Sequence, residues 1–487
     1  MIEKGIVLKL VDKYKNLPIM VKASFWFFFA SFLQNGISVL TTPIFTRLLS
    51  TSEYGEYSVF NSWMDIFSVF ISLKMYAGVF SSSIIKFEDN RQRYTAAVQG
   101  LSLTLTIIWT IFYTFNRKTI NTILSLSSAE IYAMIVMIWT TSVFSFWSVE
   151  QRVDNKYINL VIVTILISIL KPAVGIILVL NSNNKVTARI IGLAVVQFIV
   201  YITFFIKDIY RGKVFFDKNY WCYMLKFCIP LIPHYISSTI MNSSDRIMIK
   251  NMIGNSEAGI YGLAYSICMV MLIFNNALIQ TLEPWIVKKI KNNEHDDIGK
   301  VVYIALAIVA LADIVFILIA PEAVRIFSPD SYYDGRWVVP PVTMSVYFQF
   351  LYSTFALFQF YYEKKILISI ASFIGAALNI VLNYIFIPLF GYYAAGYTTL
   401  ICIAFYAGAH YLLMNRVCKK EYGRNVFNNR YILFFTLVFV TIGFLLIMTY
   451  YNDYIRYAII AILIIMICIF RRRIFTFLRI LTEVRKK

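Results

Sequence analysis

Residues 366–415 read ILISIASFIGAALNIVLNYIFIPLFGYYAAGYTTLICIAFYAGAHYLLMN and contain no Asp, Glu, Lys or Arg. An α-helix rises about 1.5 Å per residue, so about 20 apolar residues cross a hydrocarbon core of about 30 Å. The segment Pro388-Leu-Phe-Gly391 interrupts this run, because proline lacks a backbone donor and glycine favours a turn. The stretch therefore predicts two membrane-spanning helices joined by a short connection.

The composition of the whole chain agrees with a membrane protein. Of its 487 residues, 59% are apolar and 15% are charged, and the mean hydropathy is +0.69. A soluble domain carries roughly 25% charged residues, so this class is excluded. The 41 Phe, 34 Tyr and only 11 Pro also exclude a disordered or collagen-like chain.

Similar apolar runs continue along the chain and predict fourteen membrane-spanning helices in all. The connections between them are too short for a soluble catalytic domain. The first run is too long for a signal-peptide core and is predicted to be the first helix. Besides the pair above, the charge-free spans are residues 23–46, 94–116, 131–149, 190–206, 227–244, 258–282, 337–362 and 431–452. Four further spans are short or contain a charged residue: 58–80, 157–180, 301–320 and 457–470.

The cations predict the orientation of these helices. With a cytoplasmic N-terminus, the inner segments hold 33 Lys and Arg and the outer loops hold 10. Cytoplasmic loops of membrane proteins carry such an excess, so both termini are predicted to be cytoplasmic. The same clustering between apolar runs explains the net charge of +19 without a nucleic-acid partner.

Nothing in the sequence indicates an enzyme, a cofactor or a metal site. It contains no P-loop, no HExxH and no nucleophile elbow. The six cysteines form no CxxC pair, so they predict neither a zinc site nor a disulfide framework.

A short motif predicts an internal repeat. The pattern S-E-x-G-x-Y occurs as Ser52–Tyr57 and again as Ser256–Tyr261, an offset of 204 residues that also places Gly192 on Gly396. Two anchors in one register indicate two parallel copies of a six-helix unit, with the last two helices outside the repeat. Parallel repeats occur in transporters that move two bundles about a central cavity. In a structural interpretation, Ser52 and Ser256 cap the helices that follow them.

Charged residues inside the predicted spans are the candidate functional groups, because a charge in the bilayer is costly and usually faces a bundle interior. Lys74 and Lys171 lie near the middle of their spans, and Lys171 precedes a proline that would kink its helix. Cavity lining is the functional interpretation, whereas an ion pair or a snorkelling side chain is the structural one.

The remaining charges leave alternatives open. Arg246 could bind an anionic substrate. Alternatively, Arg246, Asp245 and Arg47 could each bond a neighbouring helix and so close an outer gate. The carboxylates Asp65, Asp245, Glu283 and Asp313 are candidates for proton or cation coupling, with structural pairing as the alternative. Glu283 and Pro284 are also predicted to end their helix. His234 and His410 are predicted to be hydrogen-bonded packing residues rather than proton relays.

Three segments carry a resemblance to a known family. PIFTRLLSTSEYGEY at 43–57, DRIMI at 245–249 with Gly259-Ile-Tyr261 downstream, and PLFGYYAAG at 388–396 resemble the flippases of bacterial O-antigen and capsule assembly. These belong to the multidrug/oligosaccharidyl-lipid/polysaccharide exporter superfamily. Arg47, Asp245 and Arg246 match motif positions of that family.

The resemblance implies an all-α integral membrane protein with two six-helix lobes around a central cavity and two C-terminal helices. By alternating access coupled to H⁺ or Na⁺, such a protein moves undecaprenyl-pyrophosphate-linked oligosaccharide from the cytoplasmic to the outer leaflet of the bacterial cytoplasmic membrane. Its expected partners are membrane lipids, a polysaccharide polymerase and glycosyltransferases. The predicted segments are an N-terminal cytoplasmic stretch (1–18), an N-lobe (19–207), a linker (208–225), a C-lobe (226–415), a cytoplasmic loop (416–430), the last two helices (431–470) and a basic tail (471–487).

Two other transport functions remain open from the sequence. A multidrug cation antiporter would favour acidic residues in its cavity, whereas the charges within these spans are mixed. A peptidoglycan-precursor flippase is a closer relative of the polysaccharide flippases. A membrane scaffold without transport would not need paired lobes.

Overall fold

The computed structural model describes residues 19–77, 79–294, 296–362 and 365–484, so the predicted cytoplasmic stretch 1–18 lies outside the described residues. All regular structure within the described ranges is helical. The chain forms two compact units: the first contains the described residues up to Leu49 and Phe60–Ile236, and the second contains Ser50–Val59 and the described residues from Ser237 onward.

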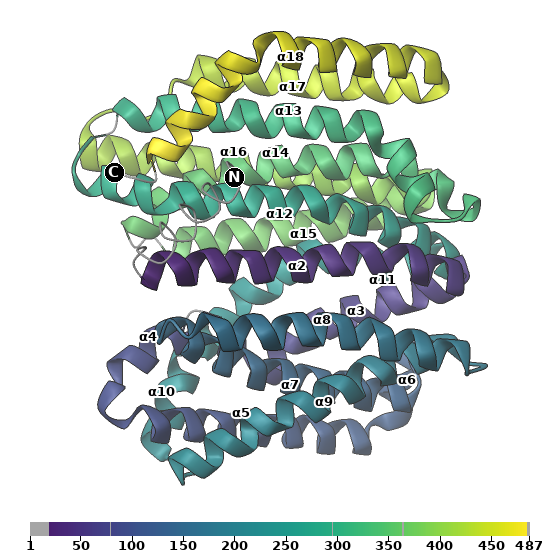
Figure 1. Cartoon of the computed structure of the whole chain (residues 1–487), viewed down its shortest axis with the longest axis vertical. Coiled ribbons are helices and arrows are strands. Elements are labelled where there is room, and N and C mark those ends of the chain that lie inside the picture. The colour runs from purple at the N-terminus through teal and green to yellow at the C-terminus, as the bar shows by residue number, and fades with distance from the viewer. Residues whose placement is uncertain (1–18, 78, 295, 363–364, 485–487) are drawn as a thin grey trace, which may run out of the picture. The chain divides into compact units, whose positions relative to one another are not determined.

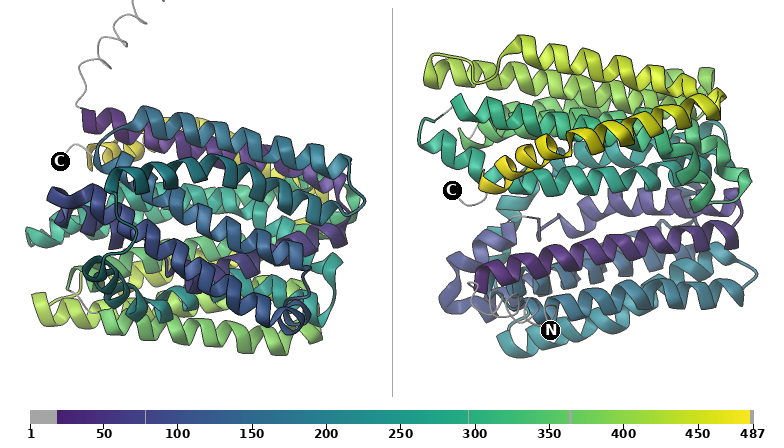
Figure 2. Two further views of the ribbon diagram at one scale, coloured as in Figure 1. Left: turned by 90° about the horizontal axis from the view of Figure 1, so that it is seen from below. Right: turned by 45° about the horizontal axis from the view of Figure 1, so that its top comes forward.

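The first unit is built around α9, which packs against α5, α7 and α8, while α2 packs along α8. These helices lie side by side in Figures 1 and 2. The helices of this unit are α2 (Ile19–Leu48), most of α3 (Thr51–Ser72), α4 (Val79–Lys86), α5 (Arg91–Phe115), α6 (Arg117–Leu124), α7 (Ser128–Val153), α8 (Tyr157–Leu180), α9 (Lys185–Gly212) and α10 (Lys218–Cys228), with short 3-10 turns at Glu88–Asn90 and Ile229–Leu231.

The second unit is built around α14, which packs against α12, α13 and α16. The last two helices, α17 and α18, lie at its edge against α13 (Figure 1). Its elements are α11 (Ile232–Met252), α12 (Asn255–Lys291), α13 (Asp296–Phe327), the 3-10 helix η3 (Asp330–Trp337), α14 (Val339–Tyr361), α15 (Lys365–Phe390), α16 (Tyr393–Tyr422), α17 (Asn429–Met448), the 3-10 turn η4 (Thr449–Tyr451) and α18 (Asp453–Val484).

Each of the fourteen predicted spans overlaps a long helix, although span 58–80 extends beyond the end of α3 at Ser72 and span 227–244 begins before α11. Ten helices are long and apolar enough to cross a membrane by length and composition, within the residues that the structure describes. The predicted spans on α3, α11, α14 and α18 are not among the ten. The all-α membrane fold is therefore confirmed, and the count of fourteen crossings stays a prediction.

The two units repeat one pattern of helix packing. In the first unit α5 packs on α7, and α7 and α8 pack on α9; in the second, α13 packs on α14, and α14 and α15 pack on α16. These are the equivalent helices if the chain contains two copies of a six-helix unit. The packing thus agrees with the duplication that the S-E-x-G-x-Y motif predicts.

The glycines of the repeated motif bring the starts of α3 and α12 together. A Cβ added at Gly55 would lie 1.8 Å from the Asn255 carbonyl oxygen, and one added at Gly259 would lie 2.0 Å from the Thr51 carbonyl oxygen. The offset between Thr51 and Asn255 is again that of the repeat, so the crossing is symmetric. Small residues allow this approach between helix backbones in membranes.

The predicted caps at Ser52 and Ser256 are wrong, because both helices begin earlier than expected. Ser50 caps α3: its Oγ accepts a hydrogen bond from the Glu53 amide at 3.2 Å, and its own amide donates to Glu53 Oε2 at 2.7 Å. This is a capping box. At the equivalent position of the second copy, Gly254 precedes α12 without a side-chain cap.

Two further helix boundaries differ from the prediction. The predicted end at Glu283 and Pro284 is wrong, because α12 continues through Pro284 to Lys291. Membrane helices tolerate an internal proline where neighbouring groups satisfy the freed carbonyl. At the other end of the chain, α18 continues through the predicted basic tail as far as Val484.

Arg456 fixes the start of α18 on the second unit. Its side chain is fully buried, and its guanidinium forms ion pairs with Glu322 of α13 at 2.5 Å and with Asp453 at 2.9 Å. Tyr457 donates a second hydrogen bond to Glu322 at 2.8 Å. The helix α18, which stands outside the repeat, is thereby attached to α13 by a buried guanidinium, a charge that is costly to leave unpaired.

Candidate functional site

Asp245 is the centre of a buried polar network in the second unit. Its side chain is 1% exposed on α11. Oδ1 accepts a hydrogen bond from Asn383 Nδ2 at 2.7 Å. Oδ2 accepts hydrogen bonds from the hydroxyls of Tyr261 at 2.6 Å and Thr399 at 2.9 Å. Side chains of α11, α12, α15 and α16 therefore converge on one carboxyl group.

A second layer of polar side chains holds this network in place. Asn383 also donates to Asn379 Oδ1 at 3.3 Å and accepts from the Thr398 hydroxyl. Ser244, the neighbour of Asp245 on α11, donates to Asn379 Oδ1 at 3.1 Å. Because each member bonds another, the position of the carboxyl group is fixed by several helices together.

The hydrogen-bonding partners of Asp245 are all neutral, which defines the chemistry that this network can do. A buried carboxylate is unfavourable unless it is paired, so this group is suited to accept a proton or a small cation. Hydroxyl, amide and carboxylate oxygens are the ligands that hard cations prefer. The network thus has the composition of a reversible proton or monovalent-cation site.

Arg246 and Arg47 each donate a hydrogen bond to a backbone carbonyl of their own helix, and Arg246 also stacks on a ring of α12. Arg246 donates to the Asn242 carbonyl at 3.1 Å and stacks on the Tyr265 ring, 4.3 Å from its centroid. Arg47 donates to the Pro43 carbonyl at 2.9 Å. Among the described residues, the Arg246 guanidinium forms no ion pair with the neighbouring Asp245 carboxylate, so the adjacent Asp-Arg pair acts on separate partners, as the helix geometry predicts.

Lys74 does not lie in mid-helix. The helix α3 ends at Ser72, and Leu73 and Lys74 adopt left-handed backbone conformations, with φ of 49° and 46°. The 22 residues of α3 already span about 33 Å at about 1.5 Å each. Lys74 therefore lies at the end of a full-length span, in a strained turn of a kind that clusters at functional sites.

Lys171 lies within α8, which continues unbroken through Pro172 to Leu180. Its ammonium group is 5.9 Å from the centroid of the Tyr201 ring on α9. Within the described part of the chain, neither Lys171 nor Lys74 forms an ion pair with a carboxylate. An unpaired ammonium among apolar helices is a candidate ligand for an anion.

The other predicted carboxylates lie in different surroundings. Asp313 is fully buried in α13, and its two oxygens accept no side-chain hydrogen bond from the described residues. Asp65 and Glu283 lie on exposed positions of α3 and α12. The structure therefore brings none of these three into the Asp245 network.

His410 is the packing residue that the sequence predicts. Its Nδ1 lies 3.0 Å from Gln359 Oε1, and Gln359 Nε2 donates to the His410 carbonyl at 2.9 Å. The ring also packs edge-on against Tyr406, with centroids 4.4 Å apart. His234 is half-buried beside Tyr235, with ring centroids 5.7 Å apart.

A second acidic cluster lies at one end of the first unit and was not expected. Gln99 on α5 donates to Asp208 of α9 at 2.9 Å. Thr95 on α5 donates to Glu150 of α7 at 2.7 Å. Beside them, Arg91 pairs with Asp154 at 2.5 Å. The cluster joins the ends of three helices that pack on one another.

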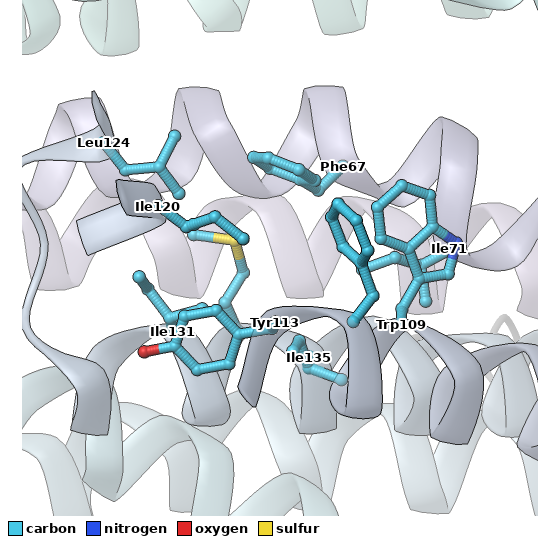
Figure 3. A pocket seen from close by; sticks show the side chains of 10 residues that line it. Phe67, Ile71, Trp109, Tyr113, Ile120, Leu124, Ile131 and Ile135 are labelled. Atoms are coloured by element: carbon cyan, nitrogen blue, oxygen red, sulfur yellow. The ribbon is translucent and has the colours of Figure 1, made fainter. Parts of the chain in front are cut away.

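The first unit also contains an apolar pocket. Figure 3 shows Phe67 and Ile71 from α3 facing Trp109 and Tyr113 from α5 across it. The remaining walls are side chains of α6 and α7, again aliphatic or aromatic. Such a lining suits a hydrocarbon chain and offers almost no polar group to orient a sugar.

A family model described as "Polysaccharide biosynthesis protein" matches residues 20–290, more than half of the chain. The chain belongs to this family. Two relatives from Haemophilus influenzae (strain ATCC 51907 / DSM 11121 / KW20 / Rd) agree with that. Protein 1 of the Lsg locus is 22% identical over 355 residues, which cover 71% of this chain and 85% of the relative. An uncharacterized membrane protein is 22% identical over 358 residues, 70% of this chain and 84% of the relative.

This polysaccharide biosynthesis protein has the fold of known flippases and transporters. The lipid II flippase MurJ, in an inward closed conformation, matches with a TM-score of 0.68 and 15% identity over 93% of this chain and all of that one (100%). A multidrug resistance MATE family transporter of the MOP superfamily, in an inward-facing conformation, matches with a TM-score of 0.60 and 14% identity. The match covers 80% of this chain and 96% of the transporter chain. The likeness shows that this family member has the fold of these membrane proteins.

Sequence reasoning about this family member found the charged centre of the network but missed its partners. Asn379 and Asn383 lie four residues apart on one face of α15, inside the charge-free stretch 366–415. Amide side chains in an otherwise apolar span are a signal of buried hydrogen bonding. A search for uncharged polar residues, and not only for charges, would have selected them.

Proposed function

We propose that this protein is a flippase that moves undecaprenyl-pyrophosphate-linked oligosaccharide repeat units from the cytoplasmic to the outer leaflet for surface polysaccharide assembly. The family match supports a role in polysaccharide biosynthesis, and the likeness to MurJ supports a fold that handles lipid-linked saccharides. The substrate would belong to O-antigen or capsule synthesis. Alternating access of the two units would carry it across.

The observation that carries this proposal is the pair of unpaired lysines in the first unit. A pyrophosphate group needs cations to enter a region of low dielectric. Lys171 lies among apolar helices and Lys74 lies in the turn after α3, both without a carboxylate partner among the described residues. Arg47 and Arg246 are further cations for the same headgroup. An antiporter for organic cations would be expected to place unpaired carboxylates there instead.

The Asp245 network supports coupling of this transport to an ion. Binding of H⁺ or Na⁺ would replace hydrogen bonds from Tyr261, Thr399 and Asn383. Because these donors belong to three helices, loading and unloading the ion would alter how α12, α15 and α16 are held on α11. Asp313 is a second candidate for this role, whereas Asp65 and Glu283 are exposed and suit gating contacts.

The expected location is the cytoplasmic membrane, with both termini cytoplasmic and no resident cofactor. Polysaccharide polymerase and glycosyltransferases are proposed neighbours in the same membrane. No catalytic role is proposed, which agrees with the transporters and flippases that share the fold.

Depletion of the protein in its own cells tests the proposal. A membrane-impermeant probe of the glycan is applied to intact cells and to inverted membrane vesicles, and the labelled lipids are identified by mass spectrometry. We expect lipid-linked oligosaccharide to accumulate on the cytoplasmic leaflet and to return to the outer leaflet when the protein is restored. Unchanged sidedness of every lipid-linked saccharide would contradict the proposal.

The same experiment separates the peptidoglycan-precursor alternative, which the likeness to MurJ favours. Accumulation of lipid II instead of a polysaccharide repeat unit would assign the protein to peptidoglycan synthesis. Normal sidedness together with increased sensitivity to organic cations would assign it to multidrug antiport.

A further inference from the structure

The connection between α13 and α14 presents two arginines against one aromatic ring. The guanidinium carbon of Arg336 lies 3.9 Å from the centroid of the Tyr333 ring, and that of Arg325 lies 4.6 Å from the same centroid. Two cations that gather on one ring repel each other. Such an arrangement is favourable when an anionic group is present to contact both.

Neither arginine is neutralised by the protein. Among the described residues, no carboxylate forms an ion pair with Arg325 or Arg336, although Asp330 and Asp334 lie exposed in the same 3-10 helix. Arg336 Nε is buried and has no hydrogen-bond partner in the described part of the chain. Glu322, three residues before Arg325, pairs with Arg456 through Oε1. Donors are therefore left over at this position.

Aromatic side chains extend the surface beyond Tyr333. The Arg336 guanidinium is 5.2 Å from the Trp337 ring centroid, and Trp337 packs against Tyr451 at 5.1 Å. Tyr451 is 83% exposed. Tyr333, Trp337 and Tyr451, with Arg325 and Arg336, are called the aromatic platform below.

The protein holds this platform rigidly. Tyr332, the neighbour of Tyr333, is 1% exposed, and its hydroxyl donates to the Ser50 carbonyl at 3.1 Å. Its ring packs edge-on against Tyr54, with centroids 5.9 Å apart. A side chain whose backbone is fixed in this way loses little entropy when a ligand binds.

We propose that the aromatic platform binds a saccharide chain that carries an acidic group. The apolar face of a sugar ring packs on tyrosine and tryptophan, whose rings offer large and stiff contact areas. Arginine donates two parallel hydrogen bonds to a carboxylate or phosphate. Asp330 and Asp334 supply acceptors for sugar hydroxyls. An ordinary interfacial belt of aromatic residues needs no unpaired arginines.

The platform would receive the glycan at one end of the transport path. The α13–α14 connection lies in a loop that the charge distribution predicts to be outer, at the same end of the second unit as the α17–α18 turn (Figure 1). The inference rests on the proposed function for the identity of the ligand. The platform would then hold the head of the flipped lipid as it leaves the protein.

Binding to the purified full-length protein in lipid nanodiscs tests the inference. The probes are a tetrasaccharide of alternating N-acetylglucosamine and glucuronic acid, neutral chitotetraose of equal length, and inorganic pyrophosphate. We expect the acidic tetrasaccharide to bind most tightly and its binding to change tryptophan fluorescence, with the change lost in Trp337→Phe.

Variants decide which residues bind. Removal of charged hydrogen-bond donors in an Arg325→Gln, Arg336→Gln double variant should weaken binding of the acidic tetrasaccharide about tenfold or more. Arg325→Lys, Arg336→Lys should lose part of the affinity, because lysine keeps the charge but not the planar stack. The matched control, Arg117→Gln with Lys118→Gln, removes two cations from another loop predicted to be outer and should leave binding unchanged. Equal thermal melting of all variants shows that they fold.

Three results would overturn the inference: no binding of the acidic tetrasaccharide, binding that is indifferent to Arg325 and Arg336, or binding of pyrophosphate alone at these residues. The outcome is independent of the leaflet assay. Normal flipping without saccharide binding at the platform would disprove the platform and leave the flippase proposal intact. Saccharide binding at the platform, together with unchanged leaflet sidedness in depleted cells, would support the platform and disprove the flippase proposal.

Discussion

At the scale of single residues, Asp245 shows how a buried carboxyl group is kept in a membrane protein. Three neutral donors contact its two oxygens, and they come from three different helices. A neutral network of this kind stabilises the charge without cancelling it. The group therefore keeps an affinity for a cation that an arginine partner would remove.

Replacing Asp245 by asparagine should separate ion binding from folding. Asp245→Asn keeps the shape and removes the charge, so we expect substrate transport to fall about tenfold or more while the protein still inserts and melts normally. Dependence of transport on pH or Na⁺ should also disappear. The exposed Asp89→Asn is the matched control. Full ion dependence in Asp245→Asn would contradict the role of this residue.

Lys171 should matter for the substrate and not for the ion. In Lys171→Gln the headgroup loses a charged hydrogen bond, so we expect affinity for the lipid-linked saccharide to fall by about 10- to 100-fold. The exposed Lys118→Gln controls for loss of charge. Binding to reconstituted protein measures the difference, and equal affinity of both variants would show that Lys171 has a structural role.

The ion pairs of Asp154, between α7 and α8, should make stability depend on acid. Partial burial opposes ionisation, but hydrogen bonds from Lys156 and Arg91 outweigh it and hold the pKa of Asp154 below its usual range. Because the pKa is lower in the folded protein than in the unfolded chain, ionised Asp154 stabilises the fold, and this stabilisation is complete above about pH 4. It is lost as the pH falls through the pKa of the folded state. The melting temperature of Arg91→Gln should therefore lie below that of the wild type near neutral pH. This difference should narrow at lower pH; a constant difference would contradict the ion-pair explanation.

At the scale of helices, the crossing of α3 and α12 is the tightest contact that the repeat creates. A methyl group at Gly259 would meet the Thr51 carbonyl at 2.0 Å, so Gly259→Ala forces the two helices apart. We expect a loss of stability of about 1–3 kcal/mol. Gly408→Ala on α16 is the control, since no atom lies within 4 Å of its added Cβ. Thermal melting that is the same for both variants would contradict the close crossing.

Much of the arrangement of helices was predictable from the sequence. The apolar runs locate every long helix, because crossing a membrane requires them, and the motif at Gly55 and Gly259 identifies the duplicated unit. Helix ends were less predictable: the span around Lys74 stops at Ser72, whereas α12 passes through Pro284. Ends depend on local hydrogen bonding and packing that hydropathy does not record.

The candidate site was predictable only in part for a similar reason. A charge such as Asp245 is conspicuous in an apolar span. Its partners Asn383 and Thr399 are ordinary polar residues, and more than 130 residues separate them from it in sequence. Only the three-dimensional packing of α15 and α16 on α11 selects them from the many others of their type.

At the scale of the whole molecule, the two compact units and the family match support transport by a duplicated membrane protein. Each unit carries its own chemistry: unpaired lysines in the first, and the Asp245 network in the second. Such a division suits a mechanism in which one part holds the anionic substrate and the other binds the driving ion. In the proposed function, these two parts together move a lipid-linked oligosaccharide between leaflets.

Reconstitution into proteoliposomes measures this movement most directly. Vesicles that contain the purified full-length protein are loaded with a fluorescent undecaprenyl-pyrophosphate oligosaccharide, and an impermeant quencher reports which leaflet holds it. We predict that an ion gradient accelerates the exchange between leaflets, that Asp245→Asn abolishes this acceleration, and that Lys171→Gln slows the exchange by weakening substrate binding. An exchange rate equal to that of protein-free vesicles, under every gradient of H⁺ and Na⁺, would contradict the proposed flippase function.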